Sequence, residues 1–434
     1  MTLIENIQAL EVLDSRGNPT LQVTVYLSDG HSGSAIVPSG ASTGSKEALE
    51  RRDQDPKRYN GKGVLEAVRA VETILAPHLK HQNPFDQKTI DERMIDLDGT
   101  SNKSRLGANA ILGVSMATAA AAAHASNIPL YRQLRSCESL YLPVPMMNIL
   151  NGGAHADTNV DIQEFMVIPV AAPNFHEAVR WGAEIYHNLK KVLKKKKLAT
   201  GVGDEGGFAP RLESNEAALH CIAEAINHSG LRLGQDVYLA LDCAASEFYR
   251  DGHYHLDQQS WTSEALLRYY ESLLRQFPII SIEDGMAEDD HMGWQQLTAA
   301  LGDKIQLVGD DVFVTNPAIL KQGISAHIAN ALLVKLNQIG TVTETFHAID
   351  VAHQAGYRCI ISHRSGESED TFIADLSLAS SAKQNVVRLL IIILHGNKFV
   401  VQVSANSLCP SYTDQQSCRP CATTTHADDR YCFQ

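Results

Sequence analysis

Five short apolar runs, each followed by a charged or imidazole side chain, constrain the fold of this chain more than any other feature. The runs have four or five residues and are almost free of polar side chains, which is typical of strands buried on both faces of a parallel sheet. They span residues 237–241, 278–282, 305–309, 331–334 and 359–362. The residues that follow them lie 25 to 41 positions apart and are Asp242, Glu283, Asp310, Lys335 and His363.

These spacings leave room for one crossover helix between successive strands, so a β/α barrel is the simplest architecture. Barrels of this kind carry their chemistry at the C-terminal ends of the strands, where the five side chains above would meet. The fold class predicted is therefore α/β, with a (β/α)8-type barrel over residues 136–380.

The first 135 residues have a different pattern. Residues 20–27 alternate apolar and polar side chains, as in an antiparallel strand with one solvated face. Residues 63–79 and 109–125 have helical apolar spacing, and the second segment is so rich in alanine that it must pack closely against a neighbour. Strands followed by helices predict an N-terminal α+β domain over residues 1–135.

Composition excludes some classes of function. With 37 basic and 50 acidic residues the net charge is -13, which argues against a nucleic-acid or anionic-membrane binder. The first residues lack the basic and apolar regions of a secretory signal, and no apolar stretch approaches the length of a membrane span. We therefore expect a cytoplasmic protein with reduced, mostly buried cysteines in its first 400 residues, and expect the lysines at 194–197 to be the solvated end of a helix.

Asp242, Glu283 and Asp310 would lie on three consecutive strand ends and point into one opening. Three close carboxylates repel one another unless a hard cation lies between them, and oxygen-only ligands favour magnesium over zinc. Lys335 follows on the next strand and has two interpretations. It is either an ion-pair partner of these carboxylates, or a base whose pKa is lowered by burial and a neighbouring cation.

Further polar residues are placed to contact a phosphorylated substrate. His363, Arg364 and Ser365 offer an imidazole, a planar guanidinium and a hydroxyl at one strand end, which suits a phosphate. Glu205 lies in a glycine-rich loop that could bring an acid over a substrate, and Glu164 is a candidate partner for it, since neighbouring carboxyls separate each other's pKa values. The small residues at 38–44 are typical of a mobile lid.

Several motifs together resemble the enolase family, in the family's order, from residue 1 to about 378. They are DSRGNPT at 14–20, SGASTG at 39–44, MNILNGG at 147–153, DIQEF at 161–165, GDEGGF at 203–208, SIEDG at 281–285, VGDD at 308–311 and ISHRSGE at 361–367. The resemblance implies dehydration of 2-phosphoglycerate to phosphoenolpyruvate, an N-terminal α+β domain on a barrel of the enolase kind, two Mg²⁺ ions per site, and a homodimer or higher homo-oligomer.

The resemblance also implies a role for each site residue. Lys335 would abstract the proton from C2 of the substrate, and Glu205 would protonate the departing hydroxyl. The first magnesium would be held by Asp242, Glu283 and Asp310, and the second would be joined by Ser42. The substrate would be lined by His155, Gln163, Glu164, His363, Arg364 and Ser365.

The C-terminal segment departs from the family pattern. Where the family has a lysine for the substrate carboxylate, this chain reads SAKQNVVR at 381–388, which places Val386 at the lysine's position. Codons for residues 382–388, read in another frame, can spell Gln-Thr-Lys-Arg-Gly-Ser, the missing motif. A frameshift would make residues 381–434 an aberrant tail that replaces the usual end of the barrel, although the apolar run 386–394 has the hydrophobicity to fill the last strand's place.

Two other functions stay open at this point. The chain could be a non-catalytic scaffold with the family fold, which the missing lysine favours. It could instead be a related enzyme acting on unphosphorylated acids, against which the Arg364 and Ser365 pair argues. The pair CRPC at 418–421 has the spacing of a zinc knuckle but lacks a second pair at zinc distance.

Overall fold

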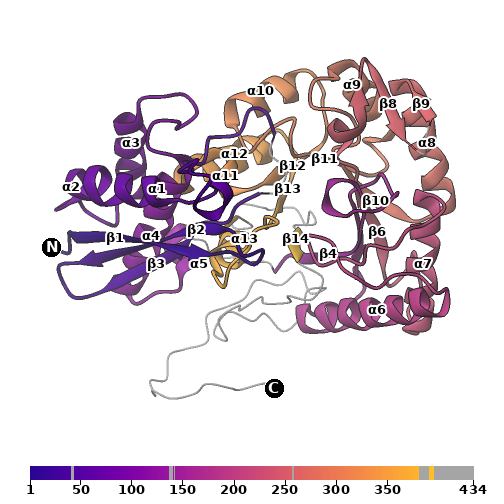
Figure 1. Ribbon diagram of the computed structural model, residues 1–434, viewed down its shortest axis with the longest axis horizontal. Coiled ribbons are helices and arrows are strands. Elements are labelled where there is room, and N and C mark those ends of the chain that lie inside the picture. Colours follow the sequence, from indigo (N-terminus) through magenta and orange to yellow (C-terminus); the bar gives the residue numbers. More distant parts are fainter. Residues whose placement is uncertain (41–43, 136–139, 141, 257–258, 381–390, 395–434) are drawn as a thin grey trace.

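Two structural units follow one another along the chain, a helix-covered antiparallel sheet and a closed barrel (Figure 1). The computed structural model describes residues 1–434 except 41–43, 136–139, 141, 257–258, 381–390 and 395–434. The predicted fold class is confirmed.

The first unit begins with three antiparallel strands in the order β1-β2-β3. These are β1 (Ile4–Leu13), β2 (Pro19–Leu27) and β3 (Ser32–Ile36). In β2, Leu21, Val23 and Val25 are fully buried, whereas the residues between them are partly exposed. The alternating pattern therefore has its expected cause, because only one face of the sheet is covered.

Helices cover that buried face. They are η1 (Tyr59–Gly61), α1 (Leu65–Ala70), η2 (Val71–Leu75), α2 (Ala76–Leu79), α3 (Gln87–Asp98), α4 (Ala108–Ser126) and α5 (Leu130–Leu134). A Cβ on Gly33 of β3 would lie 2.1 Å from the backbone nitrogen of Ala121, so the alanine-rich α4 touches the sheet backbone to backbone. Contrary to the expectation from composition, α4 is long and apolar enough to cross a membrane, but it is almost entirely buried as a core helix.

Eight strands close the barrel in the order β10-β11-β12-β13-β14-β4-β5-β6. They are β4 (Val144–Asn151), β5 (Glu164–Ile168), β6 (Tyr238–Asp242), β10 (Ile279–Glu283), β11 (Gln306–Gly309), β12 (Ala331–Val334), β13 (Arg358–Ile361) and β14 (Ile391–Leu394). The five apolar runs are β6, β10, β11, β12 and β13, and neighbours among them pair in parallel.

One barrel strand runs against the others. β5 pairs antiparallel with both β4 and β6, because the chain returns from β4 through a short loop containing η3 (Gly153–His155) instead of a crossover helix. A simple repeating β/α barrel would not contain this reversal. Its consequence is that Glu164, the first residue of β5, pairs with Asp242, the last residue of β6, at the same end of the barrel.

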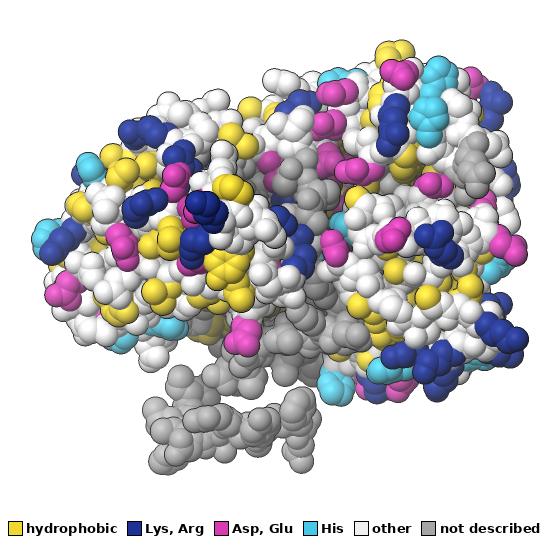
Figure 2. Space-filling model, in the orientation of Figure 1, with side chains coloured by type: hydrophobic (Ala, Val, Ile, Leu, Met, Phe, Trp, Pro, Cys, Tyr) yellow, Lys and Arg dark blue, Asp and Glu magenta, His cyan; other side chains and the backbone are white. Residues whose placement is uncertain are grey.

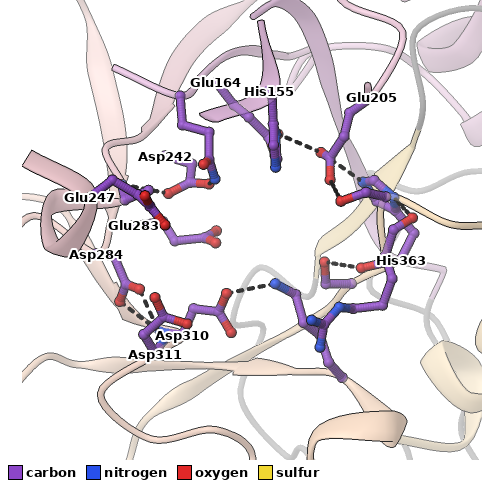
Figure 3. Close-up of a pocket in the computed structure, with 16 residues that line it drawn as sticks. His155, Glu164, Glu205, Asp242, Glu247, Glu283, Asp284, Asp310, Asp311 and His363 are labelled. Carbon is purple, nitrogen blue, oxygen red and sulfur yellow. Dashed lines mark hydrogen bonds and ion pairs between the residues drawn. The ribbon is translucent and has the colours of Figure 1, made fainter. Parts of the chain in front are cut away.

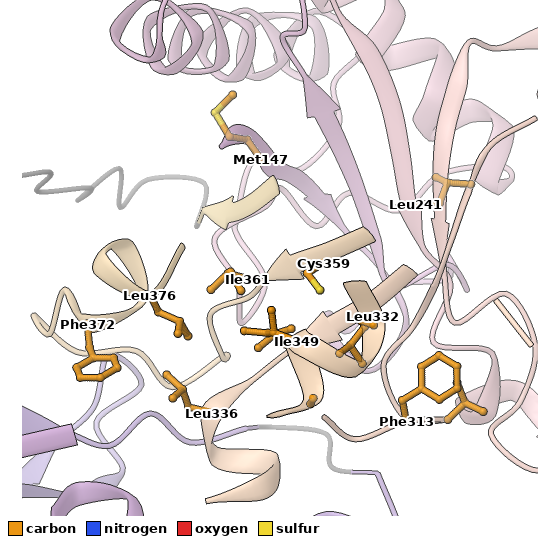
Figure 4. Close-up of a cluster of buried hydrophobic side chains, with 14 of the residues drawn as sticks. Met147, Leu241, Phe313, Leu332, Leu336, Ile349, Cys359, Ile361, Phe372 and Leu376 are labelled. Atoms are coloured by element: carbon orange, nitrogen blue, oxygen red, sulfur yellow. The ribbon is translucent and has the colours of Figure 1, made fainter. Parts of the chain in front are cut away.

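The barrel strands are apolar along their whole length because both faces are buried. Leu333 and Ile360 belong to a cluster inside the barrel, whereas Leu332 and Ile361 belong to the larger core between strands and helices. Figure 4 shows Leu332, Cys359 and Ile361 on the strands near Ile349 of α12 (Val342–Gln354) and Leu376 of α13 (Phe372–Ser380). The helices thus complete the outer layer that the apolar runs require.

Six of the eight outer helices in the described part of the chain begin after a residue whose side chain caps them. Each capping side chain accepts a hydrogen bond from a backbone N–H of the first turn. The capping residues are Asn174, Ser214, Thr262, Asp290, Asn316 and Thr341. The helices are α6 (Phe175–Lys195), α7 (Asn215–His228), α8 (Ser263–Gln276), α9 (His291–Leu301), α10 (Pro317–Ser325), α11 (Leu336–Ile339), α12 (Val342–Gln354) and α13 (Phe372–Ser380). The 3-10 turn η4 (Ala245–Phe248) precedes a small sheet of β7 (Tyr249–Arg250), β8 (His253–Leu256) and β9 (Gln259–Trp261).

The last barrel strand comes from the segment predicted to be an aberrant tail. β14 pairs in parallel with β13 on one side and with β4 on the other, which closes the barrel. Residues 391–394 of this segment thus stand in the place of the last strand. Their apolar sequence suits a strand between two parallel neighbours, as the hydrophobicity of run 386–394 suggested. The rest of the tail, including Val386 and the CRPC pair, lies outside the described residues.

Charged side chains of both signs are mixed over the face shown in Figure 2, with basic ones gathered over α6. α6 ends at Lys195, and the lysines at 194–197 are exposed, as expected for a solvated helix end. Cys221, Cys243 and Cys359 are buried free thiols, which confirms that expectation for the described cysteines.

Candidate active site

A polar pocket with about 510 Å³ of empty space opens at the C-terminal ends of the barrel strands (Figure 3). Charged side chains come from many separate segments and converge on it, as expected for this end of a barrel. The lining residues are His155, Gln163, Glu164, Glu205, Asp242, Ala244, Glu247, Glu283, Asp284, Asp310, Asp311, Lys335, Ser362, His363, Arg364 and Ser365.

The three predicted metal ligands all face this pocket. Asp242 and Glu283 end the adjacent strands β6 and β10, and Asp310 directly follows β11. All three side chains are buried. Burial raises the pKa of Asp242 to about 6 although Lys335 opposes the shift, and burial together with Asp242 and Asp310 raises the pKa of Glu283 well above its usual range. Burial and the repulsion among these carboxylates both disfavour their charged forms, and a bound cation would relieve this electrostatic cost.

Two further carboxylates lie beside Asp310. Carboxylate oxygens of Asp284, Asp310 and Asp311 lie within 4.8 Å of one another. The Asp284 side chain accepts the backbone N–H groups of Asp310 and Asp311, both at 2.9 Å, and so fixes the turn after β11. Burial and the neighbouring Asp310 raise the pKa of Asp311 to about 8. Sequence reasoning missed Asp284 and Asp311, although each adjoins a predicted ligand in the doubled acids of SIEDG and VGDD.

Lys335 follows β12 and reaches back to the carboxylates. Its Nζ lies 2.6 Å from Oδ2 of Asp310, and both side chains are mostly buried. Burial alone would lower the pKa of Lys335, but Asp310 and Glu283 outweigh it and hold that pKa above the usual lysine value. Of the two interpretations of this lysine, the structure shows the ion pair with Asp310.

The opposite wall carries an imidazole between two acids. Nδ1 of His155 lies 3.5 Å from Glu164 and 3.7 Å from Glu205. Burial, and then the charge of Glu205, raise the pKa of Glu164 well above its usual range. The predicted partnership of Glu164 with Glu205 therefore has a geometric and an electrostatic basis. Gln163 joins this wall to the carboxylates by donating to Asp242 at 3.0 Å.

The residues after β13 connect the two walls. Ser365 donates to Oε1 of Glu205 at 2.8 Å, and Nε2 of His363 lies 3.8 Å from Oε2 of the same acid. Nη1 of Arg364 lies 3.2 Å from each carboxylate oxygen of Glu47, which comes from the N-terminal unit. Burial opposes the charge on Arg364, yet Glu47 and Asp310 keep the pKa of this arginine above its usual value.

The predicted lid is described only in part. Ser42 and its neighbours at 41 and 43 lie outside the described residues. Ser39 forms an antiparallel bridge with Gly366, and a Cβ on Gly40 would lie 1.8 Å from Nη2 of Arg364. Only glycine allows the backbone at position 40 to approach the guanidinium this closely.

Three further residues that the sequence did not single out organise the pocket. Glu47 and Asn337 accept hydrogen bonds from Arg364, and Gln338 donates to Oδ1 of Asp310 at 2.7 Å. Asn337 and Gln338 lie in the short helix α11 directly after Lys335. Sequence adjacency to Lys335 was the one available signal for the last two, and only the fold brings Glu47 here.

The donor set fits a hard divalent cation. Asp242, Glu283 and Asp310 offer oxygen ligands only, and among the described residues Oε2 of Glu283 is buried without a hydrogen-bond partner. Lys335 on one side and Glu205 on the other could move protons in opposite directions at a bound molecule. Arg364, Ser365 and His363 could bind an anionic group between them.

Comparison with known proteins agrees with this geometry. A family model described as the enolase N-terminal domain matches residues 4–134, and one described as the enolase C-terminal TIM barrel domain matches residues 139–387. A protein named Enolase from Acidothermus cellulolyticus is 59% identical over 384 residues, which cover 88% of this chain and 89% of that protein. The barrel match thus continues nine residues past position 378, where the motif resemblance ended.

Proposed function

The chain belongs to the enolase family, and from this membership we propose that it is a phosphopyruvate hydratase, which converts 2-phospho-D-glycerate reversibly to phosphoenolpyruvate and water. The observation that carries the proposal is one pocket lined by Lys335, Glu205, Arg364 and a group of buried carboxylates. This combination suits proton removal next to a carboxylate, loss of a hydroxyl, and binding of a phosphate.

The buried carboxylates Asp242, Glu283 and Asp310 would hold the first of two Mg²⁺ ions, and Ser42 would join the second. When bound, magnesium supplies the positive charge that stabilises negative charge developing on the substrate carboxylate. That charge is required because a proton next to a carboxylate is barely acidic: its removal adds charge to a group that is already negative.

Lys335 and Glu205 would divide the proton transfers. Lys335 takes the C2 proton as the general base, and Glu205 protonates the departing C3 hydroxyl as the general acid. Glu164, with its raised pKa, lies next to the same imidazole as Glu205, so this wall can retain a proton for the acid step. Ser365 donates to Glu205 and fixes the direction of that carboxyl.

The substrate would lie between the two walls. Arg364 and Ser365 would bind its phosphate, because a planar guanidinium and a hydroxyl match phosphate oxygens. His155, Gln163 and His363 would line the remaining surface. We further propose a cytoplasmic location and a homodimer or larger homo-oligomer, with no nucleic-acid or membrane partner.

A second function is favoured by one sequence observation. Val386 stands where the family pattern has the lysine for the substrate carboxylate. A chain that lacks this cation could keep the family fold and act as a non-catalytic scaffold.

Turnover separates the two functions. Purified full-length chain, given 2-phosphoglycerate and Mg²⁺, is expected to form phosphoenolpyruvate, and removal of Mg²⁺ with a chelator is expected to stop the reaction. Asp310→Asn should abolish magnesium-dependent binding of substrate while the circular dichroism spectrum stays unchanged. Asp350→Asn serves as the matched control. Asp350 lies on the outer helix α12 and pairs with Arg135. Absence of phosphoenolpyruvate at saturating substrate and Mg²⁺ would favour the scaffold.

A further inference from the structure

A carboxylate from the N-terminal unit reaches the barrel pocket without lining it. Glu47 follows the small-residue segment 38–44 in sequence, and Gly44 donates its backbone N–H to Oε1 of Glu47 at 3.2 Å. Only 8% of Glu47 is exposed. A buried carboxylate needs partners that stabilise its charge, and those of Glu47 all come from the active-site end of the barrel or from its own loop.

The first partner is the proposed phosphate-binding arginine. Both carboxylate oxygens of Glu47 lie 3.2 Å from Nη1 of Arg364, and the exposed fractions are 3% for the Arg364 side chain and 7% for the Glu47 side chain. Asn337 accepts from the same Nη1 at 3.2 Å. The two contacts with Glu47 and the one with Asn337 all involve Nη1 of Arg364. They hold this nitrogen in place and thereby restrict the orientation of the guanidinium.

The second partner connects Glu47 to the cation side of the pocket. Nε2 of Gln338 donates to Oε1 of Glu47 at 3.2 Å and to Oδ1 of Asp310 at 2.7 Å. The other amide atom, Oε1 of Gln338, accepts from Thr315 at 2.7 Å, which fixes the amide's orientation. Glu47 therefore contacts both the group that would bind phosphate and a group that touches a proposed metal ligand.

We propose that Glu47 is a positioning residue for the reaction, which holds Arg364 and Gln338 in the orientation that binds the substrate phosphate. The inference rests on the proposed function, since it takes Arg364 as the phosphate ligand. After Glu47, Asp310 is the acid with the largest electrostatic effect on Arg364, so without Glu47 it is the strongest competing charge. The guanidinium would then turn toward the carboxylates and away from the phosphate.

A purely structural role would make Glu47 one more ion pair between the two units. The chain offers a matched example of such a pair in Lys103 and Glu344, whose charged atoms lie 3.0 Å apart and join the N-terminal unit to α12. Glu344 also bonds to Thr341, and neither Thr341 nor Lys103 lines the pocket. Replacing Glu344 by glutamine removes one inter-unit charge and leaves Arg364 untouched.

The experiment compares Glu47→Gln with Glu344→Gln in the full-length chain. Inorganic phosphate is titrated calorimetrically at saturating Mg²⁺, and thermal unfolding is recorded for each variant. Glu47→Gln is expected to bind phosphate at least tenfold more weakly, and to raise KM for 2-phosphoglycerate by a larger factor than it lowers kcat. Glu344→Gln should stay within twofold of the wild type in phosphate affinity, whatever its loss of thermal stability.

Phosphate affinity in Glu47→Gln that equals or exceeds that of the wild type overturns the inference, because Glu47 would then be a structural pair or a competing anion. Glu47→Asp keeps the charge but draws the carboxylate back by one methylene, so we expect an intermediate affinity. If Glu47→Gln does not fold, Glu47→Asp decides, and wild-type affinity in that variant also overturns the inference. A wild-type chain that binds neither phosphate nor 2-phosphoglycerate would instead refute the proposed function, and the inference with it.

Discussion

At the scale of single residues, Lys335 and Glu205 have opposite surroundings. Lys335 is ion-paired with Asp310, whereas Glu205 accepts a hydrogen bond from Ser365 and lies near two imidazoles. A general base must be unprotonated, so Lys335 must give up a proton before it can take one from the substrate, and the ion pair with Asp310 opposes that loss. The state of Asp310 therefore controls the readiness of Lys335, which links the proposed cation site to the proposed base.

The division of labour between these two residues gives the first prediction. Lys335→Ala should stop exchange of the C2 proton of 2-phosphoglycerate with solvent deuterium, because no other base is proposed there. Glu205→Gln should block dehydration but leave measurable exchange, since proton removal precedes loss of the hydroxyl. Proton magnetic resonance of the substrate in deuterated buffer follows the exchange. Two variants that are equally inactive in exchange would contradict the assignment.

Asp91 gives a second prediction, outside the pocket. It is fully buried on α3, accepts from Gln87 and from the backbone and side chain of Thr343, and burial raises its pKa to about 6. Because the folded pKa lies above the unfolded value near 4, the folded state binds the proton more tightly. Stability is therefore highest below pH 4 as far as this group is concerned, and falls as pH rises from about 4 to 6, by at most about 3 kcal/mol.

Asp91→Asn removes this titration. We expect the urea concentration at the unfolding midpoint of the wild type to fall between pH 4.5 and pH 7. The midpoint of Asp91→Asn should fall less over the same range. The exposed Asp96→Asn on the same helix should follow the wild type at both pH values. A difference between wild type and Asp91→Asn that does not change with pH would show that Asp91 is not the group responsible.

Individual site residues were predictable where one local rule located them. Asp242, Glu283 and Asp310 were proposed because a charged residue follows each apolar run. Parallel strands bring their C-terminal ends to the same end of a barrel, where these side chains lie close together. The same rule fails for Glu164, which begins its strand and reaches the pocket only because β5 is reversed. It also fails for Glu47, whose place depends on how the N-terminal unit meets the barrel, a long-range contact with no local pattern.

At the scale of elements, strand patterns were more informative than strand directions. The five apolar runs appear as strands within one residue of their predicted bounds, since double-sided burial leaves a clear sequence pattern. The antiparallel pairing of β5 leaves none, because a strand buried on both faces is equally apolar in either direction. The connection from β4 to β5, residues 152–163, contains only the short turn η3, and this was the available signal, because a crossover to a parallel strand usually contains a full helix.

The contact between β3 and α4 gives a third prediction. A Cβ on Gly33 would meet backbone atoms of Ala117, Ala120 and Ala121 at 2.1 to 2.7 Å, and backbone cannot move aside as a flexible side chain can. Gly33→Ala should therefore push α4 from the sheet and lower stability by about 1–3 kcal/mol or more. Gly201→Ala is the matched control, because a Cβ there meets nothing within 4 Å and the change should stay within about 0.5 kcal/mol. Thermal unfolding measures both, and equal midpoints would contradict the close packing.

At the scale of the whole molecule, the two units meet through specific polar contacts. Asp91 accepts a hydrogen bond from Thr343, Lys103 pairs with Glu344, and Glu47 pairs with Arg364. Each of these three charged residues of the N-terminal unit thus has a polar partner in the barrel unit. The last of these contacts lies at the pocket. The active site therefore depends on the docking of the first unit, and a barrel alone would lack the partner of Arg364.

The end of the chain gives the last prediction, and it concerns the molecule as a whole. β14 closes the barrel between β13 and β4, so the described barrel has eight strands, although Val386 stands where the family pattern has its lysine. Closure depends on apolar character, which a shifted reading frame can retain by chance, but binding a substrate carboxylate depends on one cation.

A lost charge-assisted hydrogen bond typically costs about 1.5–3 kcal/mol. The cost should be larger in the transition state, where negative charge grows on the carboxylate, so turnover should fall more than binding. We expect the chain as written to be at least about a hundredfold slower than a version with the frame restored from codon 382, a difference of roughly 2.7 kcal/mol in barrier. Parallel expression of both genes and measurement of phosphoenolpyruvate formation test this, and equal rates would mean that another cation, such as Lys383 or Lys398, takes the missing lysine's place.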